Sequence, residues 1–232
     1  MTSAPPPGST QYADVGTRIS KAISLYVAKP LPIILISAAN LPFSIASFVI
    51  SGPAGLLLLV PSLLVQTIVE GALILAFYQV LVGQTPSAHA CFTAATEKLG
   101  ALIEFFLRTV GSFLGLCITI VGIPWGIRLL VRWFFGTQAI ILGNMSAKQA
   151  ISESCRLVTN NWWRTLGNLL LLGLLVGFPG FSLSLALGGV VGAIAGAIIG
   201  VVLGPVLAGA TTLFYLRLRY EKAQTPPATV LQ

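Results

Sequence analysis

The chain has 232 residues, of which 56% are hydrophobic and 8% are charged, and its mean hydropathy is +0.92. Because a typical soluble domain carries about 25% charged residues, this composition excludes a water-soluble globular protein and indicates an integral membrane protein. The net charge of +7 comes from basic residues beside apolar runs, which indicates contact with anionic lipid headgroups and not with nucleic acid.

The predicted elements begin after a Pro-rich tail. Residues 1–11 and 223–232 are polar and Pro-rich, and both are expected to be disordered tails of one membrane domain at 12–222. Six apolar runs in this domain each reach the roughly 20 residues that a helix needs to cross the hydrocarbon core. They cover residues 31–50, 54–82, 100–121, 123–143, 162–183 and 186–215. Very short turns join them in pairs, which predicts three helical hairpins.

An amphipathic segment precedes each predicted hairpin. Residues 12–29, 86–99 and 146–159 carry apolar side chains at spacings of three and four, which is typical of helices that lie on a membrane surface. In the first segment Arg18 is expected on the polar face. In the third, Ser146 and Gln149 match a capping box, in which the two side chains bond the first free amides of the helix.

The basic residues are distributed unequally. The short turns within the hairpins carry no basic residue. The surface segments and the neighbouring ends of the apolar runs carry ten: Arg18, Lys21, Lys29, Lys98, Lys148, Arg156, Arg164, Arg217, Arg219 and Lys222. The positive-inside rule then predicts that both termini lie in the cytoplasm, and we expect a multi-pass protein of the cytoplasmic (inner) membrane. The predicted fold class is all-α: a polytopic membrane protein with six transmembrane helices in three hairpins, each preceded by a cytoplasmic interfacial amphipathic helix.

Charged residues inside the apolar runs are candidates for a functional site, since each is costly at membrane depth without a partner. Glu70 and Arg132 lie at similar depths and are predicted to form an ion pair; the alternative is that each reaches water separately. Arg128 shares a helix face with Arg132. Glu104 and Arg108 have the favourable spacing for a helical ion pair. These groups either anchor helices or line a polar cleft for a lipid headgroup or a solute.

Uncharged polar residues and glycines predict close packing of helices. Amides at membrane depth commonly form hydrogen bonds between helices; here they are Asn40, Gln66, Gln138 and Asn168. Five glycines at a period of four form a stripe on the last apolar run: Gly188, Gly192, Gly196, Gly200 and Gly204. Such a stripe lets another helix approach closely, and that helix belongs either to the same chain or to a second copy. Trp162, Trp163 and Arg164 are expected to be interface anchors.

The sequence gives little support for an enzyme. The single histidine, His89, has no second histidine near it, and the chain lacks the short motifs of zinc proteases, serine hydrolases and nucleotide-binding loops. Acidic residues do not occur in a close pair suited to acid–base chemistry. We therefore expect no catalytic residue, no metal and no cofactor.

One set of residues resembles a known family. The set comprises Val131-Arg132-Trp133, Gln138-Ala139-Ile140, Ser146-Ala147, Trp162-Trp163-Arg164 and the closing run 213–219. It resembles the membrane domain of glycerophosphoryl diester phosphodiesterases and the stand-alone bacterial multi-span proteins related to it. The 232 residues contain no phosphodiesterase barrel, so the resemblance implies a helical membrane module with a collar of surface helices and supplies no substrate.

Three functions follow as hypotheses. The first is a non-enzymatic module of the membrane that interacts with lipids, mainly through anionic headgroups, or acts as a scaffold. The second is a transporter of a small amphipathic or anionic solute, with Arg128, Arg132 and Glu70 along the route. The third is an accessory subunit of a larger membrane complex or a homo-oligomer, joined through the glycine stripe.

Overall fold

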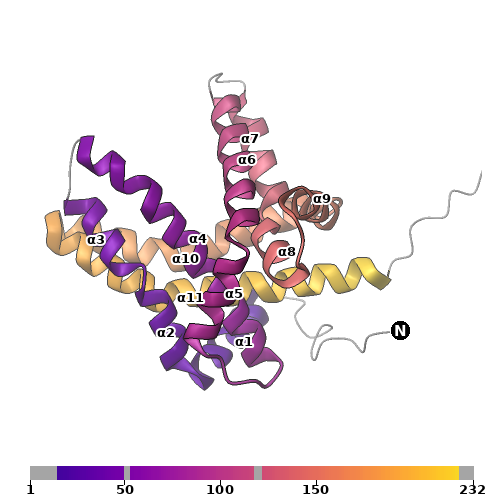
Figure 1. Ribbon diagram of the computed structural model, residues 1–232, viewed down its shortest axis with the longest axis horizontal. Helices are drawn as coiled ribbons and strands as arrows, with labels where there is room; N and C mark the ends of the chain where they lie inside the picture. The colour runs from indigo at the N-terminus through magenta and orange to yellow at the C-terminus, as the bar shows by residue number, and fades with distance from the viewer. Residues whose placement is uncertain (1–14, 50–52, 118–121, 225–232) are drawn as a thin grey trace, which may run out of the picture.

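The computed structural model describes residues 15–49, 53–117 and 122–224, with only the backbone at 47–49, 53–60 and 117. The predicted tail at 1–11 lies outside these ranges, as does 225–232. Within them the chain forms eleven helices and no strand (Figure 1). They are α1 (Val15–Ala28), α2 (Pro30–Ala38), α3 (Leu41–Val49), α4 (Pro53–Leu81), α5 (Ala88–Glu97), α6 (Leu99–Cys117), α7 (Gly122–Trp133), α8 (Gly136–Gly143), α9 (Ala147–Val158), α10 (Trp162–Leu187) and α11 (Gly189–Gln224).

Four of these helices are long and apolar enough to cross a membrane. They are α4 from Pro61 onward, α6, α10 and α11. A fifth span results only if α1 and the following segment Pro30–Ala46, which are bent by 97° from each other, count as one. The prediction of a helical membrane protein is confirmed in this coarser form. The predicted six spans are not confirmed.

Two predicted spans are interrupted. The run 31–50 divides into α2 and α3, each of nine residues. The break lies at Ala39 and Asn40, because Pro42 has no amide N–H to bond the carbonyl of Ala38 and so interrupts the helical hydrogen bonds. The run 123–143 divides into α7, of 12 residues, and α8, of eight. At about 1.5 Å per residue none of these pieces crosses a hydrocarbon core of about 30 Å.

Tertiary contacts stabilise the break between α7 and α8. The hydroxyl of Ser154, on α9, donates to the carbonyl of Arg132 at 2.7 Å and accepts from the amide of Phe135 at 3.1 Å. These bonds replace helical ones that the break removes. Gly136 is required directly after it, because a Cβ there would lie 2.1 Å from the ring of Phe105 on α6.

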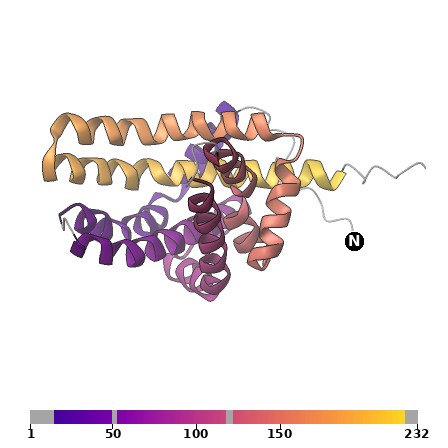
Figure 2. The same ribbon diagram turned by 90° about the horizontal axis from the view of Figure 1, so that it is seen from above.

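The consecutive helices that pack together include α3 with α4, α6 with α7, and α10 with α11. In Figure 1 the α10–α11 pair runs along the long axis, while the α6–α7 pair projects away from it. Figure 2 shows α6 and α7 nearly end-on, and α10 and α11 still side by side across the view. The turn between α10 and α11 is formed by Gly188 and Gly189, whose φ angles of 62° and 50° favour glycine.

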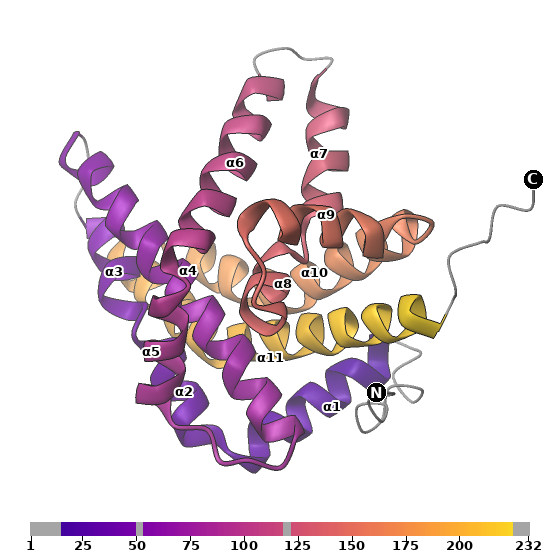
Figure 3. The ribbon, with the colours of Figure 1, turned by 45° about the vertical axis from the view of Figure 1, so that its right-hand side comes forward.

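The C-terminal half of α11 is the centre of the fold. Most of the buried residues of α11 lie there, between Pro205 and Leu218. The helix as a whole packs against α1, α2, α3 and α4, and Figure 3 shows α1 running beneath it. Phe214 and Tyr215 are buried there and contact the ring of Phe135 at centroid distances of 5.4 and 6.1 Å. This aromatic cluster joins α11 to the break between α7 and α8.

The three amphipathic segments form helices close to the predicted ranges, as α1, α5 and α9. At the start of α9 the Gln149 side-chain oxygen accepts a hydrogen bond from the backbone amide of Ser146 at 3.0 Å, as the capping box predicts. The predicted phase of α1 is wrong: Arg18 is only 3% exposed, whereas Ile23 is exposed. The Arg18 guanidinium donates a hydrogen bond to Asn168 on α10 and lies 4.2 Å from the centre of the Phe214 ring. These contacts stabilise the buried position of the Arg18 side chain.

Candidate functional site

One pocket, here called the arginine pocket, has a volume of about 600 Å³. It lies between α7, the end of α9 and the start of α10. Its lining consists of two arginines, two tryptophans and four smaller residues: Pro124, Arg128, Arg132, Val158, Thr159, Asn160, Trp162 and Trp163. No acidic residue is among them.

The two arginines share one face of α7. Arg132 is in the last helical turn, where a cation interacts favourably with the helix dipole. The Arg128 guanidinium lies 5.7 Å from the centre of the Trp125 ring. In the described part of the chain, neither arginine forms an ion pair with a carboxylate. The pocket therefore carries two positive charges that protein acids leave uncompensated.

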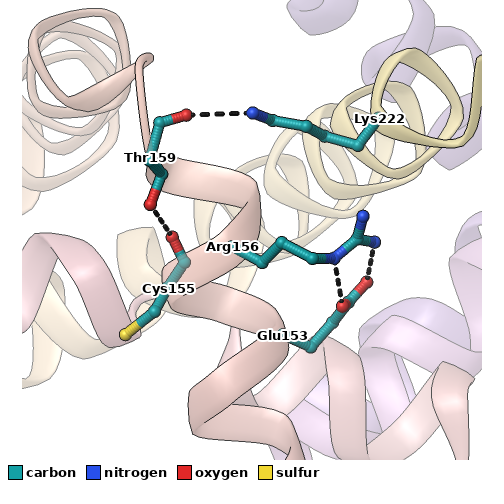
Figure 4. Close-up of polar contacts among 5 residues, drawn as sticks. All are labelled: Glu153, Cys155, Arg156, Thr159 and Lys222. Atoms are coloured by element: carbon teal, nitrogen blue, oxygen red, sulfur yellow. Dashed lines mark hydrogen bonds and ion pairs between the residues drawn. The ribbon is translucent and has the colours of Figure 1, made fainter. Parts of the chain in front are cut away.

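The opposite wall of the arginine pocket is the connection from α9 to α10. Lys222, on α11, donates to the carbonyl of Thr159 at 3.1 Å, and the Thr159 hydroxyl donates to the carbonyl of Cys155 at 2.7 Å (Figure 4). The lysine thus compensates the negative end of the α9 dipole. The first amides of α10 have no helical acceptors, and the Asn161 side chain makes no capping bond to them, so this end of α10 adds positive potential.

Beside this wall, Arg156 and Glu153 form an ion pair on α9, with two hydrogen bonds of 2.8 Å (Figure 4). The hydrogen bond from Arg156 is the main cause that holds the pKa of Glu153 below its ordinary value. Arg156 is thereby neutralised, and it does not line the pocket. The free charge of the pocket comes from α7.

A second pocket, here called the glutamate pocket, has a volume of about 380 Å³. It lies between α2, α3 and α4 on one side and α11 on the other. Its polar lining comprises Ser37, Asn40, Ser44, Gln66, Glu70 and Thr211, and its apolar lining comprises Val69, Leu73, Phe134, Ala197, Gly200, Val201, Gly204, Leu207 and Ala208. The pocket is near the middle of two candidate spans.

The amides and hydroxyls of the glutamate pocket are organised by local hydrogen bonds. The Asn40 side-chain amide donates to the Gln66 side-chain oxygen, so the expected hydrogen bond between helices is formed here. The Thr211 hydroxyl donates to the carbonyls of Leu207 and Ala208 at 3.0 and 3.1 Å. Since its proton is used in this way, Thr211 presents oxygen lone pairs to the pocket.

The structure does not bring Glu70 and Arg132 together. Glu70 lines the glutamate pocket and Arg132 lines the arginine pocket, and the described residues include no ion pair of Glu70. A similar depth in the membrane fixes only one of the three coordinates of a side chain, so two residues at the same depth can still lie in different pockets. The ion pair expected between these residues is therefore not formed.

The other predicted charged residues lie elsewhere. Arg108 and Glu104 form the expected ion pair on α6, with N and O 2.7 Å apart and both side chains exposed, but they line neither pocket. Trp163 is 79% exposed and Trp162 is partly buried at the start of α10, with ring centres 4.6 Å apart. Arg164 follows them and is exposed.

The glycine stripe serves three purposes. A Cβ on Gly192 would lie 2.2 Å from the Ser184 carbonyl, and one on Gly196 would lie 3.1 Å from that of Gly180. These two glycines allow α10 of the same chain to approach closely. Gly188 belongs to the turn, while Gly200 and Gly204 have no atom within 4 Å of a built Cβ and line the glutamate pocket.

The sequence alone did not indicate several pocket residues. Thr159 and Asn160 have no pattern that separates them from an ordinary connection, and Ser37 and Thr211 resemble any small polar residue of an apolar helix. Asn160 has a φ of 70°, a conformation that asparagine adopts more readily than most residues. The Asn-Asn-Trp-Trp run was thus the one local signal for a sharp entry into α10.

Comparisons of this chain with protein-family models, with curated proteins and with solved structures gave no match.

Proposed function

We propose that the protein is a non-enzymatic membrane module that binds the phosphate of anionic lipids in the arginine pocket. The observation that carries this proposal is the pair Arg128 and Arg132, which face one pocket with no acidic residue in its lining. Guanidinium groups bind phosphate oxygens through paired hydrogen bonds. Two of them on one helix face supply enough donors for one phosphate group.

The position of the pocket supports a lipid in preference to a soluble anion. It opens at the start of α10, a candidate span that begins with two tryptophans, and tryptophans concentrate where lipid headgroups lie. Trp125 and Ile127 on α7 are exposed beside it. An anionic lipid would fit both the arginines and the exposed apolar side chains, with its phosphate on the arginines and its acyl chains along Trp125 and Ile127.

Retention of phosphatidylglycerol against phosphatidylcholine, measured by native mass spectrometry of the full chain, tests this proposal. We expect Arg128→Gln/Arg132→Gln to lower the relative affinity for phosphatidylglycerol about 100-fold, since each charged hydrogen-bonding group contributes about 1.5–3 kcal/mol. Lys29→Gln/Lys148→Gln is the matched control. It removes the same charge from exposed positions outside the pocket and should change retention by less than about threefold.

Equal retention by the two double variants would contradict the proposal, because it would assign lipid selectivity to overall charge. Thermal unfolding of each variant separates loss of the site from loss of the fold.

The other hypotheses have less support. A single transport route along Glu70, Arg128 and Arg132 conflicts with the opening of these residues into different pockets. An accessory or homo-oligomeric role stays a prediction, which the mass of the native complex tests in the same experiment. We also propose a bacterial cytoplasmic membrane location with both termini inside, on the basis of the unequal basic residues, and a relationship to the phosphodiesterase membrane domain, on the basis of the sequence pattern.

A further inference from the structure

The glutamate pocket contains an acidic side chain at membrane depth, that of Glu70, with no basic partner among the described residues. Glu70 lies within the candidate span of α4 and lines the pocket with an exposed side chain. The described residues include no basic group in this lining and no ion pair of Glu70. Since an ionised carboxylate is costly in the hydrocarbon region, a counter-charge is expected.

The neutral polar groups of the pocket also favour a cation that donates hydrogen bonds. The hydroxyl of Thr211 donates to the backbone carbonyls of Leu207 and Ala208 on its own helix. Its proton is therefore committed, and the lone pairs of its oxygen are what it offers to a ligand. Together with the Glu70 carboxylate on α4, it forms a set of acceptors on two different helices.

The volume and the lining identify the class of cation. About 380 Å³ is many times the roughly 30 Å³ that one water molecule occupies in the liquid, so a bare metal ion would not fill the pocket. The described residues also hold no cluster of three or more His, Cys, Asp or Glu suited to a metal. Phe134, Leu73 and Val201 supply an apolar surface, and aromatic faces attract organic ammonium ions.

Missing side chains create the space. Gly200 and Gly204 line the pocket, and a Cβ built on either would meet no atom within 4 Å. The stripe that admits α10 at Gly192 and Gly196 thus continues on α11 as the open wall of a pocket. Larger residues there would fill it without displacing another helix.

We propose that the glutamate pocket binds an organic ammonium ion, with the charged amine at Glu70 and an apolar body against α11. This site differs from the arginine pocket in position and in the sign of its charge, and it does not depend on the function proposed above. The amine is either a free amphipathic amine or the headgroup of an amino lipid, since both present the same chemistry.

Binding of radiolabelled octylamine to the full chain, purified in detergent, tests the proposal. We expect saturable binding that unlabelled octylamine displaces and that octanol and octanoate do not, because only the amine carries the positive charge. Glu70→Gln should weaken binding roughly thirtyfold or more, as loss of one partner of a desolvated charge pair does. Glu104→Gln, which removes an exposed carboxylate from α6, is the matched control and should bind normally.

Gly204→Leu gives a second, independent variant. It keeps Glu70 but fills the pocket, so it should also abolish octylamine binding while the protein unfolds at an unchanged temperature. Competition by lysophosphatidylethanolamine would identify an amino lipid as the ligand, and its absence would identify a free amine; both results support the site. Octylamine binding that survives both Glu70→Gln and Gly204→Leu, or displacement by octanol as effective as by octylamine, would overturn the proposal.

Discussion

The two pockets differ in charge, in depth and in how each is built. The arginine pocket lies where α10 begins and carries two guanidinium groups, whereas the glutamate pocket lies along the middle of α4 and α11 and carries one carboxylate. The first depends on a helix break held by side-chain hydrogen bonds. The second depends on glycines that leave space open. A polar site in an apolar chain is thus formed either by adding contacts or by omitting side chains.

The largest effect is expected from glycines that differ in surroundings. Gly136→Ala should destabilise the protein by about 3 kcal/mol, the upper range for an overpacked core, because its Cβ would overlap the Phe105 ring beside the helix break. Gly200→Ala should cost nothing and stabilise the α11 helix by about 0.5 kcal/mol, since its Cβ enters open space. Thermal unfolding of both variants measures this difference in stability. Equal melting temperatures would contradict the prediction that the two glycines differ in their surroundings.

Ser154→Ala should act mainly on the arginine pocket. It leaves the Arg132 carbonyl and the Phe135 amide without their partner, which should cost about 2 kcal/mol in a buried site. It should also weaken retention of phosphatidylglycerol, because α7 loses the contact that fixes its arginines. Octylamine binding should change less, since Phe134 is the residue of the glutamate pocket that lies at this break. Ser152→Ala, on the exposed face of α9, serves as the reference; a similar change in both serine variants would argue against a role for the break.

Asn40→Ala should act on the glutamate pocket alone. The substitution removes the hydrogen-bond donor to Gln66. This should lower the free energy of unfolding by about 1 kcal/mol, because the site is only partly buried. Octylamine binding should weaken several-fold and phosphatidylglycerol retention should not change. If Asn40→Ala altered both ligands equally, the pockets would not be independent.

The smallest effect is a pH dependence near the arginine pocket. Because the hydrogen bond from Arg156 lowers the pKa of Glu153 below its ordinary value of 4.5, the pair stabilises the folded protein above that value. The stabilisation disappears as the pH falls through the lowered pKa. Since Arg156 is half exposed, the loss should be well under 1 kcal/mol. Melting temperatures between pH 6 and pH 3 should fall slightly more for the wild type than for Glu153→Gln.

Local signals in the sequence predicted individual helices well. The bounds of α4, α9 and the start of α10 agree closely with the apolar runs and the capping box, because a helix start depends on the few residues around it. The i,i+4 ion pair of Glu104 and Arg108 was predictable for the same reason. These interactions all form within one or two helical turns.

Contacts between distant residues explain what the sequence did not predict. Arg18 is buried because Asn168, 150 positions later, accepts its hydrogen bond, and the break after Trp133 depends on Ser154 of another helix. The spacing of the glycine stripe predicted a packing face for a helix of the same chain or of a second copy; Gly192 and Gly196 pack against α10, whereas Gly200 and Gly204 line a pocket. Both arginines and Glu70 were recognised as candidates, but the ion pair predicted between Glu70 and Arg132 is not formed.

The central claim is that the two pockets bind ligands of opposite charge independently. Measuring phosphatidylglycerol retention and octylamine binding on the same preparations of Arg128→Gln/Arg132→Gln and Glu70→Gln tests it most directly. We predict a crossed result: the arginine variant loses only the anionic lipid, and the glutamate variant loses only the amine. Loss of both ligands in either variant, with the fold intact, would contradict two separate sites, and loss of neither would contradict both.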